Sequence, residues 1–65
     1  MLNHFSENLK HYRKLRYMTQ QELAKKLFIT RQAVSTYENG IRHCDLDTLI
    51  RITQILGISL DDLIL

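Results

Sequence analysis

The sequence predicts an all-α fold of five short helices, and three observations support this prediction. Apolar residues recur at helical spacing along the 65 residues, and residues of the helix-capping type precede most of the apolar runs. The β-branched residues fall inside these helical patterns instead of alternating as they do in strands. A chain of this length forms one domain, residues 1–65, and folding buries about 60% of the surface that its unfolded chain exposes.

The first two helices follow from their apolar stripes and from one capping pair. The first is expected to begin near Asn3 or Ser6 and to end at Arg16, with a buried stripe of large apolar residues, Phe5, Leu9 and Tyr12. The second begins after Thr19, because Thr19 and Glu22 have the spacing of a capping box, in which each side chain accepts a hydrogen bond from the other residue's backbone N–H. Its buried face consists of Leu23, Ala24 and Leu27.

A tight turn at Phe28 and Ile29 connects the second helix to a third, which Thr30 caps and Gly40 ends. Val34 and Tyr37 are expected to point inward from this third helix. The polar residues fall on its outer side, namely Arg31, Gln32, Ser35, Thr36 and Asn39.

Two further helices complete the chain. Asp45 is expected to cap the fourth helix, which Gly57 ends, and the residues expected to supply much of the core are Leu46, Leu49, Ile50, Ile52, Ile55 and Leu56. Ser59 opens a short fifth helix, in which Asp62 stands three residues later, as in a second capping box.

The outer side of the third helix carries residue types that read DNA. A helix fits the major groove, where Arg can bridge two acceptors of guanine and Gln can bridge the edge of adenine. Thr36 can touch a thymine methyl or a phosphate. Helix N-termini offer free backbone N–H groups and a partial positive charge, so Gln20 and Thr30 mark places where phosphates can dock.

Charge is distributed in a way that agrees with DNA binding. Residues 1–44 contain eight Lys and Arg against three Glu, a balance of +5, whereas residues 45–65 contain one Arg against four Asp, a balance of −3. The half that contains the polar third helix is therefore the basic half, and its field attracts phosphate.

The segments TQQELAKKL, ITRQAVSTYENG and LDTLIRITQILGISLDDL resemble the lambda-repressor-like helix-turn-helix proteins of the phage Cro and repressor type, also called the xenobiotic-response-element family. The resemblance extends from about Asn8 to Ile64. It implies a compact bundle of five helices, with the helix-turn-helix at the second and third helices and the helix from Arg31 to Glu38 as the recognition helix.

By position, the resemblance implies base-facing roles for Arg31, Gln32, Ser35 and Thr36 and phosphate contacts for Gln20, Asn39 and Arg42, to which the cap Thr30 is added. It also implies a buried structural ion pair between Arg13 and Glu38. Three features depart from the family pattern. Phe28 stands where the family commonly has Gly, which predicts a left-handed non-glycine residue. Cys44 stands where relatives often have Pro, and Leu15 and Tyr17 replace polar or small residues.

The C-terminus contains more apolar side chains than a small monomer easily buries, and these predict a dimer seam at Leu60, Leu63, Ile64 and Leu65. The family resemblance also implies a homodimer, whose two recognition helices lie about 34 Å apart on a near-palindromic operator. The alternative is that the short fifth helix packs on its own core.

The sequence predicts no enzyme, no metal site and no cofactor. The soft ligands His4, His11, His43 and Cys44 form neither a CxxC nor an HxxxH pair, and no catalytic constellation is evident. A single Cys permits no internal disulfide, and no signal peptide, transmembrane stretch or lipidation motif appears. These features predict a cytoplasmic protein that does not bind membranes.

The function expected from the sequence is that of a sequence-specific, double-stranded DNA-binding transcriptional regulator, and more specifically a repressor of the prophage or mobile-element sort. The alternative is a protein-interaction module or antitoxin-like partner that keeps the fold and uses exposed apolar residues such as Leu15 and Tyr17. Arg31 and Gln32 at the start of the third helix favour the DNA reader, because an interaction module does not need base-edge groups there.

Overall fold

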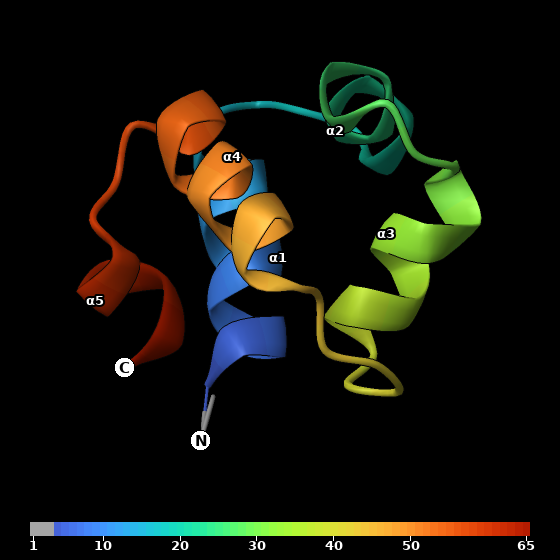
Figure 1. Ribbon diagram of the computed structural model, residues 1–65. Coiled ribbons are helices and arrows are strands. Elements are labelled where there is room, and N and C mark those ends of the chain that lie inside the picture. Colours follow the sequence, from blue (N-terminus) through green and yellow to red (C-terminus); the bar gives the residue numbers. More distant parts are fainter. Residues whose placement is uncertain (1–3) are drawn as a thin grey trace.

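The computed structural model describes residues 4–65 as five α-helices. They are α1 (Phe5–Leu15), α2 (Gln20–Leu27), α3 (Arg31–Glu38), α4 (Leu46–Leu56) and α5 (Leu60–Ile64), as Figure 1 shows. The predicted all-α fold is therefore confirmed. Arg16 is the C-cap of α1, and the earlier of the two starts expected for this helix, Asn3, lies outside the described residues.

Side-chain caps define the starts of α2, α3 and α5. The Thr19 hydroxyl accepts from the Glu22 N–H at 3.0 Å, and the Glu22 carboxylate accepts from the Thr19 N–H at 2.8 Å. Ser59 and Asp62 repeat this capping box at α5, with distances of 3.0 and 3.2 Å. The prediction for Asp45 is wrong in one respect, because its side chain makes no capping bond to the backbone. The Asp45 carboxylate accepts instead from the Thr48 hydroxyl.

A residue with left-handed backbone conformation follows each of the first four helices, one or two positions after its last residue. These residues are Tyr17, Phe28, Gly40 and Gly57, with φ of 57°, 58°, 73° and 67°. In each case the next N–H reaches back five residues along the chain to a helical carbonyl, at 3.0 or 3.1 Å, which closes the turn and satisfies that carbonyl. The left-handed conformation expected for Phe28 is confirmed, and Tyr17 adopts it as well.

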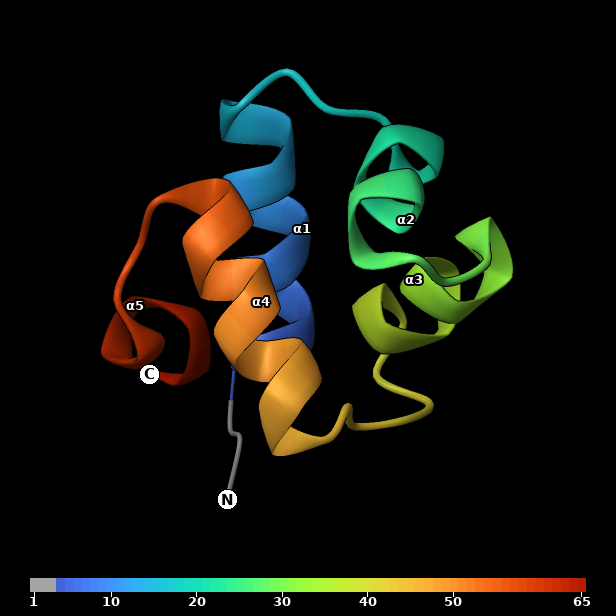
Figure 2. The same ribbon diagram turned by 45° about the horizontal axis from the view of Figure 1, so that its top comes forward.

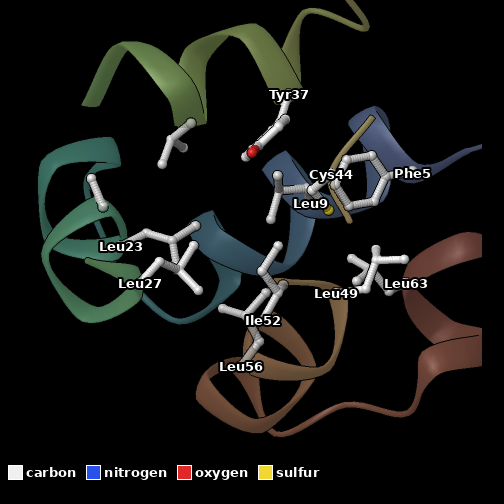
Figure 3. Close-up of a cluster of buried hydrophobic side chains, with 12 residues drawn as sticks. Phe5, Leu9, Leu23, Leu27, Tyr37, Cys44, Leu49, Ile52, Leu56 and Leu63 are labelled. Carbon is white, nitrogen blue, oxygen red and sulfur yellow. The ribbon is translucent and has the colours of Figure 1, made fainter. Parts of the chain in front are cut away.

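The helices pack around one apolar core. Helix α1 contacts α3 and α5, α2 contacts α3 and α4, and α4 contacts α5. Figure 3 shows side chains from all five helices converging on the same interior. Its members are Phe5, Leu9, Leu23, Ala24, Leu27, Val34, Tyr37, Cys44, Leu49, Ile52, Leu56 and Leu63. Two residues expected in the core are exposed instead, Leu46 at 62% and Ile50 at 42%, because both lie on the side of α4 that no other helix covers. Tyr12 and Ile55 are only partly buried.

Helix α5 is docked onto the N-terminal helix. Leu63 is completely buried in the core, and the Asn8 side-chain amide donates to the Leu63 carbonyl at 3.1 Å. Leu63 therefore belongs to the monomer core, which corrects its expected place in a dimer seam. Of the other residues expected there, Leu60 and Leu65 are exposed and Ile64 is half-buried.

The five helices are arranged from one side of the molecule to the other. Helices α3 and α5 lie on opposite sides in both views (Figures 1 and 2). Helix α2 lies beside α3, and α1 and α4 lie between that pair and α5. None of the helices in residues 4–65 is both long enough and apolar enough to cross a membrane.

Candidate nucleic-acid interface

Helix α3 buries one face and presents the other to solvent. Val34, Tyr37 and Glu38 are buried, whereas Arg31 and Gln32 at the N-terminal end are exposed. Ser35 and Thr36 are half-buried, and Asn39 is exposed at the C-cap. The structure thus places the four residues expected to face bases along the uncovered part of one helix.

A buried ion pair anchors this helix to α1. Arg13 Nε and Nη2 donate to the two carboxylate oxygens of Glu38, at 2.6 and 3.0 Å, as the resemblance implies. The exposed fractions of the two side chains are 8% and 2%. Arg13 Nη1 also donates to the Met18 carbonyl at 2.6 Å. The two-pronged geometry makes this contact depend on orientation as well as on distance.

The ion pair continues to the surface through Gln20. The Gln20 amide nitrogen donates to Glu38 Oε1 at 3.2 Å, and its amide oxygen accepts from Arg31 Nη1 at 3.4 Å. The side chain of Gln20 therefore connects Glu38 in the interior with Arg31 on the exposed face. Sequence reasoning placed Gln20 at a phosphate and missed this bridge, because the bridge depends on how α2 crosses α3. One N–H of the Gln20 amide is still free to donate to a phosphate.

The hydroxyl groups of α3 are largely engaged with the helix itself. The Thr30 hydroxyl accepts from the Ala33 N–H at 3.1 Å and so caps the helix. The Thr36 hydroxyl donates to the Ala33 carbonyl at 2.8 Å. The Asn39 side-chain amide donates to the Ser35 hydroxyl at 3.4 Å. These bonds restrict the rotamers of the outer side chains before any ligand is bound.

A shallow hollow of about 250 Å³ lies against α3 and is lined by Thr30, Gln32, Ala33, Thr36 and Arg42. The Arg42 guanidinium carbon lies 5.9 Å from the centre of the Tyr37 ring, within the range of a cation–π contact. The hollow brings together four residues that the sequence assigns to DNA contacts. It also includes the half-buried Ala33, for which the sequence predicts no DNA contact.

The interface has no features of a metal centre. Among residues 4–65, no three His, Cys, Asp or Glu side chains come together in a group that could hold a metal ion. The polar groups around α3 are cations, amides and hydroxyls, which are the groups that contact phosphates and base edges.

A family model described as Helix-turn-helix matches residues 9–63. The chain belongs to the lambda-repressor-like helix-turn-helix family. A relative from Bacillus subtilis, the uncharacterized HTH-type transcriptional regulator YqaE, is 55% identical over 92% of this chain and 52% of its own length. The chain spans about half the length of the curated relatives that it matches first.

Two kinds of solved protein contain a region of similar fold. A transcriptional regulator from Listeria innocua superimposes with a TM-score of 0.86 at 28% identity, over 92% of this chain and 56% of that one. Hydroxypropylphosphonic acid epoxidase from S. wedmorenis superimposes with a TM-score of 0.88 at 35% identity, over 94% of this chain and 32% of that one. The epoxidase match is therefore partial, and the helix-turn-helix regulators support the prediction that the domain is not itself an enzyme.

Proposed function

We propose that this domain binds double-stranded DNA in a sequence-specific manner to regulate transcription, and that α3 reads the major groove. The observation that carries the proposal is the uncovered face of α3, where Arg31 and Gln32 are exposed at the N-terminal end. A recognition helix contacts base edges with its N-terminal residues, and Arg and Gln are suited to guanine and adenine.

The surrounding residues divide into two groups under this proposal. Arg31, Gln32, Ser35 and Thr36 face the bases, and Gln20, Thr30, Asn39 and Arg42 contact the phosphates. The restricted rotamers of the side chains on α3 favour DNA binding, because a side chain that is already oriented loses less entropy on binding. Gln20 helps to orient the Arg31 side chain, because its amide oxygen accepts a hydrogen bond from the Arg31 guanidinium.

We extend the proposal to a homodimer that acts as a repressor on a near-palindromic operator. A protein that occupies a promoter excludes polymerase without binding any further partner, which makes repression the simplest mode of action. A cytoplasmic location belongs to the same proposal, because the single thiol of Cys44 suits a reducing compartment.

Selection of bound DNA from a random pool tests the proposal. We expect the wild-type protein to enrich one consensus with two inverted half-sites, and the Gln32→Ala variant to relax the preference at defined positions. Placing the selected site across a promoter in a reporter strain should lower expression. Failure to enrich any sequence at moderate salt would refute sequence-specific reading.

A second candidate function is binding of a partner protein, and it is favoured by the apolar residues at the end of α1. Leu15 is 52% exposed and Tyr17 is 93% exposed. We expect Leu15→Ser with Tyr17→Ser to leave DNA binding unchanged, since neither residue belongs to α3. If these substitutions abolish a protein interaction and the selection finds no operator, the interaction module becomes the better account.

A further inference from the structure

We infer that the hollow beside α3 takes the 5-methyl group of a thymine, so that the domain specifies a T·A pair at that place in its site. The inference rests on the proposed DNA-binding function and assigns one base to one surface feature. The hollow lies on the uncovered side of α3, is open to solvent, and is lined by Thr30, Gln32, Ala33, Thr36 and Arg42.

In the hollow, Thr36 can contact a base with its methyl group more readily than with its hydroxyl. The Thr36 hydroxyl donates its proton to the Ala33 carbonyl at 2.8 Å, so it does not donate to a base in this rotamer. What Thr36 has left to offer is its γ-methyl group and an oxygen that can only accept. Ala33 contributes a second methyl. Apolar contact from Ala or from the Thr methyl is the interaction that recognises the thymine methyl in the major groove.

The rim of the hollow supplies the complementary polar groups. Across the major groove a T·A pair presents the thymine methyl, thymine O4, and then N6 and N7 of adenine. Gln32 lines the same hollow and has the side-chain amide that pairs with this adenine edge. Arg42, which also lines the hollow and lies over the Tyr37 ring, adds one positive charge suited to a backbone phosphate. The hollow therefore contains groups that can contact the thymine methyl, the edge of the paired adenine and a backbone phosphate.

The test uses deoxyuridine, which differs from thymidine only by lacking the 5-methyl group. Each thymine of the selected site is replaced in turn, and the dissociation constant of the wild-type protein is measured. We expect one position in each half-site at which the replacement weakens binding by roughly fourfold, the factor equivalent to one buried methyl-sized group. In the Thr36→Ser variant, which keeps the hydroxyl and loses the methyl, the discrimination between thymine and deoxyuridine at that position should fall clearly below the wild-type value.

The chain offers a matched control. The Thr53 hydroxyl on α4 donates to the Ile50 carbonyl at 2.6 Å, which reproduces the local geometry of Thr36 on another helix. Thr53→Ser therefore makes the same chemical change and should keep the wild-type discrimination between thymine and deoxyuridine. Comparing the two variants separates a loss of the contact from a general effect of the substitution on a helix.

The outcomes separate this inference from the proposed function. A protein that selects a site but is insensitive to every deoxyuridine replacement would overturn the inference and leave DNA reading intact. The same holds if Thr36→Ser retains the discrimination, or if the selected half-site contains no thymine. A protein that enriches no DNA at all would overturn both.

Discussion

At the scale of single residues, the most consequential contact is the ion pair of Arg13 and Glu38. The pair is nearly removed from solvent, and its neighbours Met18 and Gln20 complete its hydrogen bonds. Among residues 4–65, no buried side-chain nitrogen or oxygen lacks a partner. A satisfied buried pair contributes little to net stability compared with an apolar replacement, but removing one partner leaves the other charge buried and alone.

Arg13→Ala should therefore destabilise the fold before it affects any DNA contact. We expect the free energy of unfolding to fall by about 3–5 kcal/mol, as measured by urea denaturation or, if the variant is unfolded in water, by loss of helical circular dichroism. Lys14→Ala removes the exposed neighbouring charge and should change stability by less than about 0.5 kcal/mol. Equal stabilities for the two variants would show that the ion pair does not hold α3 in place.

Cys44 provides a prediction about pH. Burial raises the pKa of its thiol from 9.0 to about 11, so the fold disfavours the thiolate. The folded-state pKa lies above the unfolded one, and the stability that the buried thiol contributes is therefore present below pH 9 and lost as the pH rises toward 11. Cys44→Ala should show a smaller loss of stability than the wild-type protein over this range in thermal melts. A disulfide reagent at pH 8 should react slowly with the native protein and rapidly in urea.

At the scale of elements, the sequence specifies helix starts more clearly than helix ends. The capping boxes at Thr19 and Ser59 depend on residues three positions apart, so local sequence is sufficient to find them. Of the four left-handed residues that follow helices, Gly40 and Gly57 can also be found from local sequence, whereas the other two are aromatic. The left-handed turn at Tyr17 was not predicted, because an aromatic residue in that conformation is stabilised by the return of Met18 to the Arg13 carbonyl and not by its own preference.

The turn between α2 and α3 stores strain that can be released. Phe28 is left-handed and 87% exposed, so its ring gains little from packing. Phe28→Gly should raise the free energy of unfolding by about 0.5–1 kcal/mol, because glycine adopts this conformation without steric cost. Phe28→Ala removes the ring but keeps the Cβ atom and should give no comparable gain. If thermal melts rank Phe28→Gly below Phe28→Ala, the turn is not strained.

At the scale of the whole molecule, the burial of a residue depends on how the helices cross. A single sequence predicts this burial less well than it predicts the helices themselves. Periodicity identified the apolar side of α4 but could not show that Leu46 and Ile50 lie beyond the reach of the other helices. It also could not show that α5 folds back on α1 and buries Leu63. The four residues predicted to face bases lie together on α3, because the family motif orders them along a single helix, and their role stays a prediction.

Because Leu63 is buried in the core, a test of the dimer seam should change the exposed residues near it instead. Leu60 and Leu65 are the exposed large apolar residues of the α5 end, and α5 lies on the side of the molecule opposite α3 (Figures 1 and 2). The Cα atoms of each copy extend 25 Å along the longest axis, a size compatible with α3 helices about 34 Å apart in two copies joined at this end. Leu60→Asp with Leu65→Asp should lower the sedimenting mass to that of a monomer without unfolding it.

Leu46→Asp with Ile50→Asp charges a different exposed apolar surface and serves as the control for the α5 seam. This control variant should sediment as the wild-type dimer does. If it dissociates and the α5 variant does not, the seam lies on α4. A monomeric wild-type protein that binds a single half-site would exclude the homodimer altogether.

Base reading by α3 is tested most directly by the base-by-base binding profile of Gln32→Ala on the selected site. We expect losses of about 1–3 kcal/mol confined to particular base pairs, where the wild-type preference disappears. Gln54→Ala, which truncates an exposed amide on α4, should keep the wild-type profile. A Gln32→Ala profile that is weakened equally at every position, or unchanged, would contradict base reading by α3.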